Sequence, residues 1–269
     1  MKSIIIGGGS IGKRHSKNLN NLGVSTIIVD IDRINDIDNI LQEGFDLGLV
    51  CTPNINHIEH CIKLAQHNIP IFCEKPFYSN LEGVEDLLSL VKEKNLITMV
   101  GCNLRFTPEI QKINPHSKYI SVYFGYDLKK WRPQTNHLKS YSANKNLGGG
   151  VLLDVIHELD YLYHKFGSIK KITYTKNKLT DITMDTEDLV VGRIEFKKGN
   201  IADFTLNYLS EEYQRYYDVL DKGLLKRVNL CLDNQMYIDE ISYFLNCIKS
   251  NTQGMNSFKE AHQLLKHLI

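Results

Sequence analysis

A glycine-rich turn near the start of the chain constrains its fold more than any other sequence feature. The β-branched run at residues 4–6 precedes a G-x-G-x-x-G motif over residues 7–12, and a helical pattern follows over residues 13–22. Strand, glycine turn and helix in this order are typical of a dinucleotide site, in which the glycines permit a tight turn, close approach of the pyrophosphate and close helix packing. The helix N-terminus adds a partial positive charge. We expect the cofactor to contact Gly7, Gly9, Ser10, Ile11 and Gly12.

The acid Asp30 ends the next predicted strand, residues 25–29, about 20 residues beyond the glycines. An acid in this position accepts hydrogen bonds from the adenosine ribose and repels a 2′-phosphate, so NAD is favoured over NADP. NADP stays open, because Arg33 lies close enough to accommodate a 2′-phosphate. In the alternative interpretation, Asp30 only starts a turn, as Asp often does.

Strands and helices alternate through residue 101, which predicts a doubly wound parallel sheet. Residues 31–44 are short for a crossover, so we expect a helix–strand unit beyond Asp30 to be missing. We therefore assign residues 1–103 to an N-terminal Rossmann domain of an α/β protein. The other strands expected here cover residues 46–51, 70–73 and 97–100, and the other helices cover 57–67 and 81–94.

The pattern changes from about residue 118, where longer alternating strands begin. One strong helix, residues 150–166, interrupts them, and two amphipathic helices, residues 236–249 and 257–268, follow them. We assign residues 104–269 to a C-terminal α+β domain with a mostly antiparallel, open sheet. Its expected strands cover residues 119–126, 170–176, 186–196 and 201–208, with a hairpin formed by 216–220 and 224–230.

The composition argues against several classes of protein. The formal net charge is +1 at pH 7 with Lys and Arg dispersed, so we expect no nucleic-acid partner. No apolar run reaches the length of a membrane span, and the first run is too short for a signal peptide. The six cysteines form no C-x-x-C pair and no metal-like spacing, which favours reduced thiols, a cytoplasmic location and no bound metal.

The tripeptide Glu74-Lys75-Pro76 follows a predicted parallel strand, at the end where open α/β sheets bind ligands. A lysine there can donate a hydrogen bond to a substrate hydroxyl or carbonyl. If it is desolvated beside the cofactor, its pKa falls and it can join a proton relay. The alternative is an ordinary surface lysine before a proline-initiated loop.

His157 lies on the predicted helix 150–166 with a carboxylate one turn away on either side, Asp154 and Asp160. A carboxylate in this position can fix the imidazole tautomer and raise its basicity, as a general base that removes a hydroxyl proton requires. The alternative is a salt-bridged surface histidine. Upstream, cationic and aromatic side chains could hold a phosphate and stack on a sugar ring, or could form a basic loop around a core tryptophan. These candidate substrate residues are Trp131, Arg132 and Tyr141.

The ordered set of motifs resembles the Gfo/Idh/MocA oxidoreductases, named for glucose–fructose oxidoreductase, inositol dehydrogenase and MocA. The match runs in register over most of the chain, and the segment from residue 139 to 161 is similar to the branch associated with surface-polysaccharide and nonulosonic-acid clusters. The motifs that carry the resemblance are Gly7-x-Gly9-x-x-Gly12 with His15, Thr52-Pro53 with His57, Glu74-Lys75-Pro76, Asn103-Leu104-Arg105-Phe106 and Gly148-Gly149-Gly150 with His157-x-x-Asp160.

The resemblance implies a role for each motif. Lys75 would contact the reacting hydroxyl, and His157 would be the acid/base. Asp154 and Asp160 compete to support His157, because family members commonly place the acid four residues before the histidine rather than three. Asn103 and Arg105 would lie near the cofactor–substrate boundary. The residues implied to line the cofactor are Thr52, Pro53, Asn54, His57, Glu74 and Lys75.

The predicted function is an NAD(P)-dependent oxidoreductase that transfers a hydride between nicotinamide C4 and a secondary hydroxyl or ketone of a sugar. The branch resemblance implies a nucleotide sugar of surface-polysaccharide biosynthesis, and the family resemblance implies a homo-oligomer joined through the open sheet. One alternative is an imine or tetrapyrrole-type reductase on the same fold. Another is a regulator that binds NAD and a sugar without turnover.

Overall fold

The computed structural model describes residues 1–131, 141–180 and 184–269, which divide into two compact units. The first unit comprises Met1–Asn103 together with Asn234–Ile269, and the second comprises Leu104–Asp233. The sequence pattern assigns the C-terminal segment to the second domain, residues 104–269, whereas in the structure it lies with the first unit.

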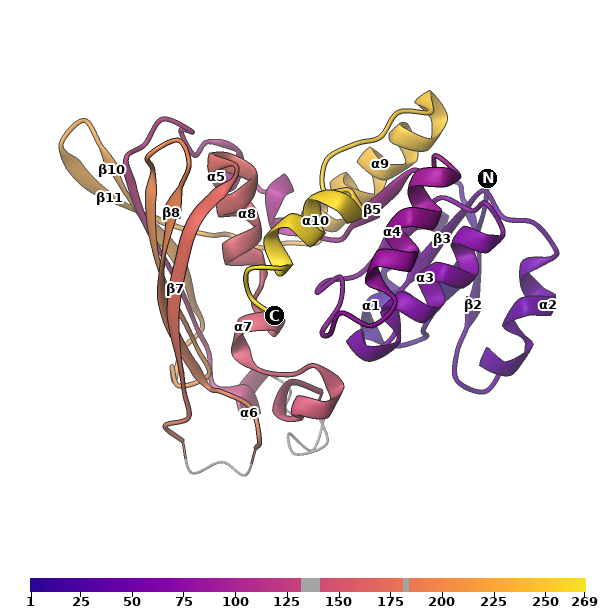
Figure 1. The fold of residues 1–269 in the computed structure, drawn as a ribbon, viewed down its shortest axis with the longest axis horizontal. Helices are drawn as coiled ribbons and strands as arrows, with labels where there is room; N and C mark the ends of the chain where they lie inside the picture. Colours follow the sequence, from indigo (N-terminus) through magenta and orange to yellow (C-terminus); the bar gives the residue numbers. More distant parts are fainter. Residues whose placement is uncertain (132–140, 181–183) are drawn as a thin grey trace. The chain divides into compact units, whose positions relative to one another are not determined.

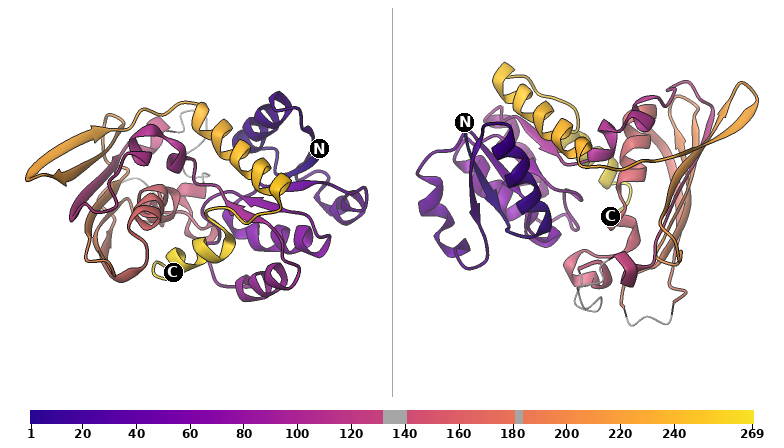
Figure 2. Two further views of the ribbon diagram at one scale, coloured as in Figure 1. Left: turned by 90° about the horizontal axis from the view of Figure 1, so that it is seen from above. Right: turned by 180° about the vertical axis from the view of Figure 1, so that it is seen from behind.

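The first unit is built on a parallel five-stranded sheet with the strand order β2-β1-β3-β4-β5. Helices α1 and α9 cover one face and α3 and α4 cover the other (Figures 1 and 2). Because both faces are covered, β3, β4 and β5 are buried along their whole length. The strands are β1 (Lys2–Ile6), β2 (Ser25–Val29), β3 (Leu47–Val50), β4 (Ile71–Cys73) and β5 (Thr98–Val100), and the helices are α1 (Ser10–Asn21), α3 (His57–Gln66), α4 (Val84–Glu93), α9 (Gln235–Ser250) and α10 (Phe258–Leu265). The predicted doubly wound sheet is confirmed.

The strand order places the topological switch point of this sheet at β1 and β3. The chain runs from β1 to β2 on one side and then crosses to β3 on the other side of β1. Open α/β sheets bind their ligands outside the carboxyl ends of the strands at such a point. The glycine turn follows β1 and Thr52 follows β3, so both lie at this edge of the sheet.

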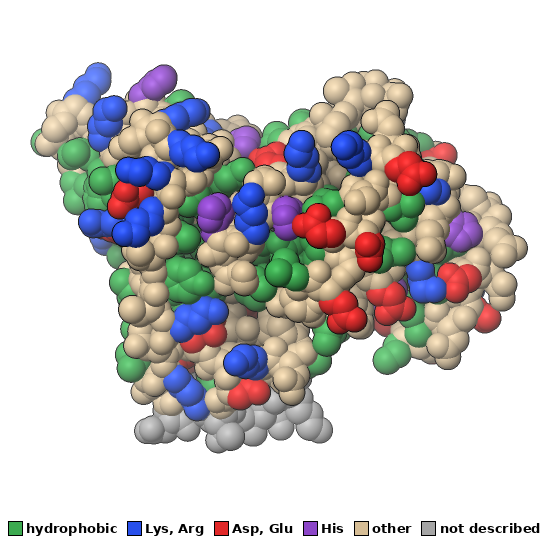
Figure 3. All heavy atoms as spheres, in the orientation of Figure 1, with side chains coloured by type: hydrophobic (Ala, Val, Ile, Leu, Met, Phe, Trp, Pro, Cys, Tyr) green, Lys and Arg blue, Asp and Glu red, His purple; other side chains and the backbone are tan. Residues whose placement is uncertain are grey.

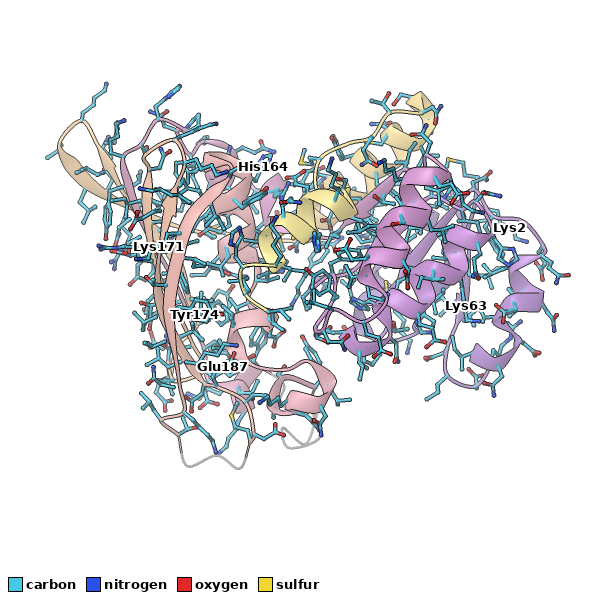
Figure 4. The ribbon with its side chains drawn as sticks, in the orientation of Figure 1. Lys2, Lys63, His164, Lys171, Tyr174 and Glu187 are labelled. Atoms are coloured by element: carbon cyan, nitrogen blue, oxygen red, sulfur yellow. The ribbon has the colours of Figure 1, made fainter. Side chains whose placement is uncertain are left out.

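The segment after β2 holds one short helix, α2 (Ile37–Leu41), and β2 is the edge strand of the sheet. This arrangement agrees with the expected loss of a helix–strand unit beyond Asp30. The segment is tied to α3 by Lys63, labelled in Figure 4, whose ammonium donates to both carboxylate oxygens of Asp38 at 2.9 Å.

The C-terminal segment belongs to the first unit because it covers the other edge of that sheet. The backbone N–H of Val100 donates to the carbonyl of Asn256 at 2.8 Å, and the Asn256 amide donates back to the Val100 carbonyl at 2.7 Å. Glu240 of α9 accepts from the backbone N–H of Cys102 at 2.6 Å. These contacts satisfy the edge of β5, which would otherwise present unpaired backbone groups. Hydrogen bonds between segments more than 130 residues apart leave no local sequence pattern.

The second unit is built on a six-stranded sheet in the order β11-β10-β6-β9-β8-β7. All neighbours are antiparallel except β6 and β9, so the predicted mostly antiparallel sheet is confirmed. The described helices of this unit line one face of the sheet (Figures 1 and 2), which explains why buried residues alternate with more exposed ones along most of β6 and β9. The strands are β6 (Tyr119–Gly125), β7 (Ile169–Asn177), β8 (Leu189–Phe196), β9 (Ile201–Asn207), β10 (Gln214–Asp221) and β11 (Leu224–Asn229), and the helices are α5 (Pro108–Gln111), α6 (Leu128–Trp131), α7 (Val151–Asp154) and α8 (His157–Phe166).

The predicted single helix 150–166 is wrong, since the structure breaks it into α7 and α8. The break lies at Val155, whose φ of −107° and ψ of 33° are not helical. Val155 is β-branched and a weak helix former, and the carboxylate of the preceding Asp154 is held by hydroxyl groups from outside the helix. Asp154 and His157 therefore lie on different helices, so the one-turn spacing that was expected between them does not apply.

The described surface carries both signs of charge, with Lys and Arg side chains lying among Asp and Glu side chains in the view of Figure 3. None of the helices in the described ranges combines the length and apolar character needed to cross a membrane.

Candidate cofactor and catalytic sites

The turn after β1 has space for side chains at some glycines and not at others. Gly7 has a φ of +107°, and a Cβ there would lie 2.6 Å from the Cys51 carbonyl oxygen. A Cβ on Gly12 would overlap the carbonyl oxygen of Gly7, whereas one on Gly9 would meet no atom within 4 Å. Gly9 and Ser10 are exposed where α1 begins, and the first N–H groups of a helix have no partner within it. The exposed backbone donors fit a pyrophosphate.

Replacing Gly12 by Ala is expected to lower the free energy of unfolding by about 1–3 kcal/mol, because the new methyl group collides with backbone rather than with a flexible side chain. Urea unfolding measures this change. Gly9→Ala is the matched control, since its methyl group enters open space and its extended backbone accepts alanine. Equal stability of the two variants would contradict the assigned packing role of Gly12.

Asp30 lies where an adenosine ribose acid is expected. It is exposed directly after β2, and its carboxylate lies against Gly8 of the glycine turn. One carboxylate oxygen accepts from the backbone N–H of Ile31 at 2.9 Å. The other faces the glycine turn at Gly8. Ribose binding by Asp30 stays a prediction.

The segment after β3 is held by two histidines of α3. His57 is fully buried, and its Nε2 lies 2.9 Å from the Thr52 carbonyl oxygen. His60 Nδ1 lies 3.2 Å from the Thr52 hydroxyl. Burial lowers the pKa of both histidines, although backbone hydrogen bonds oppose this for His57. Of the neighbouring residues that were expected to line the cofactor, Pro53 is exposed and Asn54 is buried.

The Glu74-Lys75-Pro76 segment follows β4 at the same edge of the sheet. Glu74 accepts from His15 Nε2 at 2.7 Å, and His15 is fully buried on α1. Burial alone would raise the pKa of Glu74, but the hydrogen bond and charge of His15, together with the charges of Lys75 and His57, lower it. Glu74 therefore stays ionised beside the partly exposed Lys75. The Lys75–Pro76 peptide bond is cis.

Asn103 ends the first segment of this unit and is 4 % exposed. Its buried Oδ1 has no hydrogen-bond partner within residues 1–131, 141–180 and 184–269. An acceptor left in this state favours a ligand donor. The expected position of Asn103 near the cofactor–substrate boundary stays a prediction.

In the second unit, Asp154 is a buried carboxylate that three hydroxyl groups hold. It accepts from the Tyr141 phenol, from Ser142 Oγ at 2.7 Å and from the Tyr208 phenol at 2.9 Å. Trp131 packs edge-on against Tyr208 with 6.1 Å between ring centroids. Of the three expected substrate residues, Tyr141 contacts Asp154 directly, Trp131 contacts its partner Tyr208, and Arg132 lies outside the described residues.

Asp160 forms a buried, two-point ion pair with Arg105. Arg105 Nε and Nη2 each donate to one carboxylate oxygen at 2.7 Å, and both side chains are nearly inaccessible. A third guanidinium nitrogen lies 3.3 Å from Nδ1 of His164, labelled on α8 in Figure 4. Arg105 was expected at the cofactor–substrate boundary, but this pair commits much of its guanidinium to α8.

Replacing Arg105 by Met is expected to lower the free energy of unfolding by about 3 kcal/mol, because it leaves the Asp160 carboxylate buried without its partner. Urea unfolding of the purified protein measures the loss. Arg193→Met is the control: it removes a similar two-point pair, with Asp203, that lies on the exposed face of the sheet. Equal losses in the two variants would contradict this account.

His157 is the first residue of α8 and is partly exposed. The helix that carries it is fixed by a second ion pair, in which Arg215 of β10 donates to both oxygens of the buried Glu158 at 2.6 and 3.0 Å. His157 therefore combines access to solvent with a rigid support.

Several residues that hydrogen-bond to the candidate site residues were not predicted from the sequence. His60 is a residue that the spacing could have revealed, because it lies one turn after His57 on the predicted helix 57–67. The partners Tyr208, which follows β9, and Arg215 of β10 lie far along the chain and leave no comparable signal.

Comparison with known protein families gives two matches on the same chain. Residues 28–102 match the oxidoreductase family with an NAD-binding Rossmann fold, and residues 120–226 match the GFO/IDH/MocA C-terminal domain. The chain belongs to the Gfo/Idh/MocA oxidoreductase family. This membership accounts for the order of the two units in the chain. The glycine turn itself precedes the matched residues, so its assignment rests on the geometry described above.

Curated relatives of this Gfo/Idh/MocA chain have several named activities. It is 29% identical over 192 residues to the 2,7-anhydro-N-acetylneuraminate hydratase of Escherichia coli, covering 67% of this chain and 51% of the relative. The hydratase of Mediterraneibacter gnavus is 24% identical, with 65% and 49% covered. The chain thus spans about half the length of these relatives. It is also 28% identical to the myo-inositol 2-dehydrogenase of Thermotoga maritima, with 75% and 67% covered.

Solved structures share the complete fold. GenD2 from gentamicin A biosynthesis, in complex with NAD, superimposes with a TM-score of 0.83 at 17% identity, covering 100% of this chain and 92% of GenD2. The UDP-N-acetylglucosamine 3-dehydrogenase GnnA of Acidithiobacillus ferrooxidans gives a TM-score of 0.79 at 16% identity, with 99% and 94% covered. At these identities the likeness concerns the fold alone.

Proposed function

We propose that this chain is an NAD-dependent dehydrogenase that oxidises a secondary hydroxyl of a sugar, or reduces the matching ketone. One observation carries the proposal: the edge of the parallel sheet at its switch point bears the glycine turn, the ribose acid Asp30 and the Lys75 segment together. Membership of an oxidoreductase family supports it.

Three groups take part directly in the proposed reaction: the cofactor, Lys75 and His157. Bound NAD would supply the hydride acceptor, nicotinamide C4. The Lys75 ammonium donates a hydrogen bond to the substrate oxygen, and the His157 imidazole takes the hydroxyl proton as the C–H hydride leaves and the carbonyl forms. Arg105 neutralises Asp160, and three hydroxyl groups hold Asp154. In this proposal both carboxylates are fixed groups that position the residues around His157.

We further propose a nucleotide sugar as the substrate, in surface-polysaccharide biosynthesis. Trp131 and Tyr141 are partly exposed aromatic side chains suited to stacking on a sugar ring, Trp131 packing on the buried Tyr208 and Tyr141 donating to Asp154. A related fold, GnnA, is named for a UDP-sugar. We also expect a homo-oligomer formed through the outer face of the six-stranded sheet. A monomer found by light scattering would contradict this expectation.

The test is a panel of substrates with NAD, followed by the absorbance of the reduced nicotinamide. The panel holds UDP-N-acetylglucosamine, myo-inositol and 2,7-anhydro-N-acetylneuraminate, chosen from the named relatives. Turnover that is fastest with the UDP-sugar supports the full proposal, and turnover with inositol alone limits it to free polyols. NAD binding without turnover on any panel member would favour the regulator. A separate assay with NADH and an imine tests the imine reductase, which oxidation of NADH with that compound alone would favour.

Replacing Asp30 by Ser is expected to raise kcat/KM with NADP relative to NAD by at least about tenfold, because a carboxylate repels the 2′-phosphate. The ratio is measured with the best substrate of the panel. Asp38→Ser is the control, since Asp38 is an exposed acid that pairs with Lys63 instead of facing the glycine turn. An unchanged ratio in Asp30→Ser would show that this carboxylate does not select the cofactor.

A further inference from the structure

Each residue of the Glu74-Lys75-Pro76 segment is held by a hydrogen bond that leads back to a buried histidine. His15 Nε2 lies 2.7 Å from Glu74 Oε1. The other Glu74 oxygen accepts from the backbone N–H of Lys75 at 3.3 Å. The carbonyl of Pro76 lies 2.8 Å from His57 Nδ1. The backbone on both sides of the Lys75 side chain is therefore anchored.

His57 connects two segments that end neighbouring strands. Its two ring nitrogens lie 2.9 Å from the Thr52 carbonyl oxygen, after β3, and 2.8 Å from the Pro76 carbonyl oxygen, after β4. A neutral imidazole donates to one of these carbonyls, and the protonated ring donates to both. The side chain is fully buried, so it cannot itself line a solvent-accessible cofactor site as its motif implied.

His15 connects the Lys75 segment to the nucleotide loop. It lies three residues after Gly12 on α1, the helix that begins at the glycine turn. Its ring is fully buried and packs edge-on against Phe72 of β4, with 5.2 Å between ring centroids. In this position Nε2 faces Glu74.

We propose that His15 and His57 are positioning residues that fix where the Lys75 side chain lies at the sheet edge and where it points. His15 acts from α1, the helix that follows the glycine turn, and His57 links the Lys75 segment to Thr52. This inference rests on the proposed function for its catalytic consequence. A displacement of about 1 Å can cost 10²-fold in rate, so anchors that touch no substrate can still govern kcat. The competing explanation is that the two histidines only fill the core, in which case their loss lowers stability without a selective effect on Lys75.

The test compares His57→Leu and the more conservative His57→Gln with the control His67→Leu. His67 lies at the exposed end of the same helix, α3. Hydrogen exchange of the free protein, followed by mass spectrometry, reports on residues 51–56 and 74–80 without requiring any substrate. Steady-state kinetics with NAD and the best panel substrate report on kcat and KM. His15→Gln provides an independent second anchor variant if His57→Leu fails to fold.

We expect His57→Leu to speed exchange by about tenfold in the two segments and not in β1 or α4, because it removes the imidazole ring that lies within hydrogen-bond distance of both carbonyls. We expect kcat to fall by about 10²-fold, while KM for NAD changes by less than about threefold. His57→Gln, which keeps an amide donor, should recover part of both losses.

Unchanged exchange in residues 74–80 would overturn the inference, as would uniformly faster exchange across the first unit. An equal fall in kcat for His67→Leu would also overturn it. If the wild-type protein oxidises no sugar, the proposed function fails on its own. The exchange experiment then still decides whether the histidines hold the Lys75 segment.

Discussion

His157→Ala is expected to lower kcat by about 10²–10⁴-fold, because a positioned general base contributes a factor of this size. The variant removes the imidazole from the first turn of α8 and leaves both Arg–carboxylate pairs of that helix intact. KM for NAD should change little, since the residues proposed to bind the cofactor lie in the other unit. Steady-state kinetics with saturating NAD and the best panel substrate measure the loss.

Two further measurements separate a lost base from a damaged fold. Added imidazole should restore part of the turnover of His157→Ala in proportion to its concentration, since the free ring can replace the missing one. The acid-side limb of the pH–rate profile should disappear in the variant, because the group that must be deprotonated is gone. His116→Ala, at an exposed loop position, serves as the control. Full turnover in His157→Ala on intact substrate would reject the assignment.

Lys75→Met is expected to lower kcat by a comparable factor, about 10²–10⁴-fold, because the ammonium that polarises the reacting oxygen is replaced by an apolar chain of similar length. The structure gives this variant a second expected effect. The charge of Lys75 helps to lower the pKa of Glu74, so its removal raises that pKa while the hydrogen bond from His15 remains.

The contribution of ionised Glu74 to stability is present above the pKa that an unfolded glutamate has, about 4.3, and is lost as the pH falls through the lower, folded value. Lys75→Met should therefore lose stability at a higher pH than wild type during acid titration, as urea unfolding at several pH values would show. Lys92→Met, at an exposed position on α4, is the control for both effects. If Lys75→Met weakened NAD binding more than kcat, the lysine would belong to the cofactor site.

The effects of Lys75→Met and His157→Ala can be interpreted separately because different contacts hold the two side chains in place. Lys75 is anchored through its own backbone and its two neighbours, so a change at His15 or His57 should imitate part of Lys75→Met. His157 is carried by a helix whose acids are neutralised by Arg105 and Arg215. Replacing either arginine should therefore lower the free energy of unfolding more than it lowers kcat.

Much of the fold could be predicted from the sequence because local periodicity encodes it. The glycine turn follows from its motif, the parallel sheet of the first unit from short apolar runs that alternate with helical patterns, and the strands of the second sheet from alternation with a period of 2. The helix 150–166 was the exception. Its apolar periodicity continues through Val155, but Asp154 is engaged by hydroxyl groups of Tyr141, Ser142 and Tyr208, and the helix breaks there.

By itself, the sequence determined where the candidate residues stand along their elements: the glycines and Asp30 after β1 and β2, Lys75 after β4, and His157 on a helix. Only the tertiary structure decided which partner each polar group takes. His15 hydrogen-bonds with Glu74, 59 residues away in the sequence, and Arg105 pairs with Asp160, 55 residues away. Residues 234–269 pack at the edge of the first sheet. The physical reason is that a buried charge or sheet edge must find a partner, and that partner is chosen by packing in space, which local spacing does not encode.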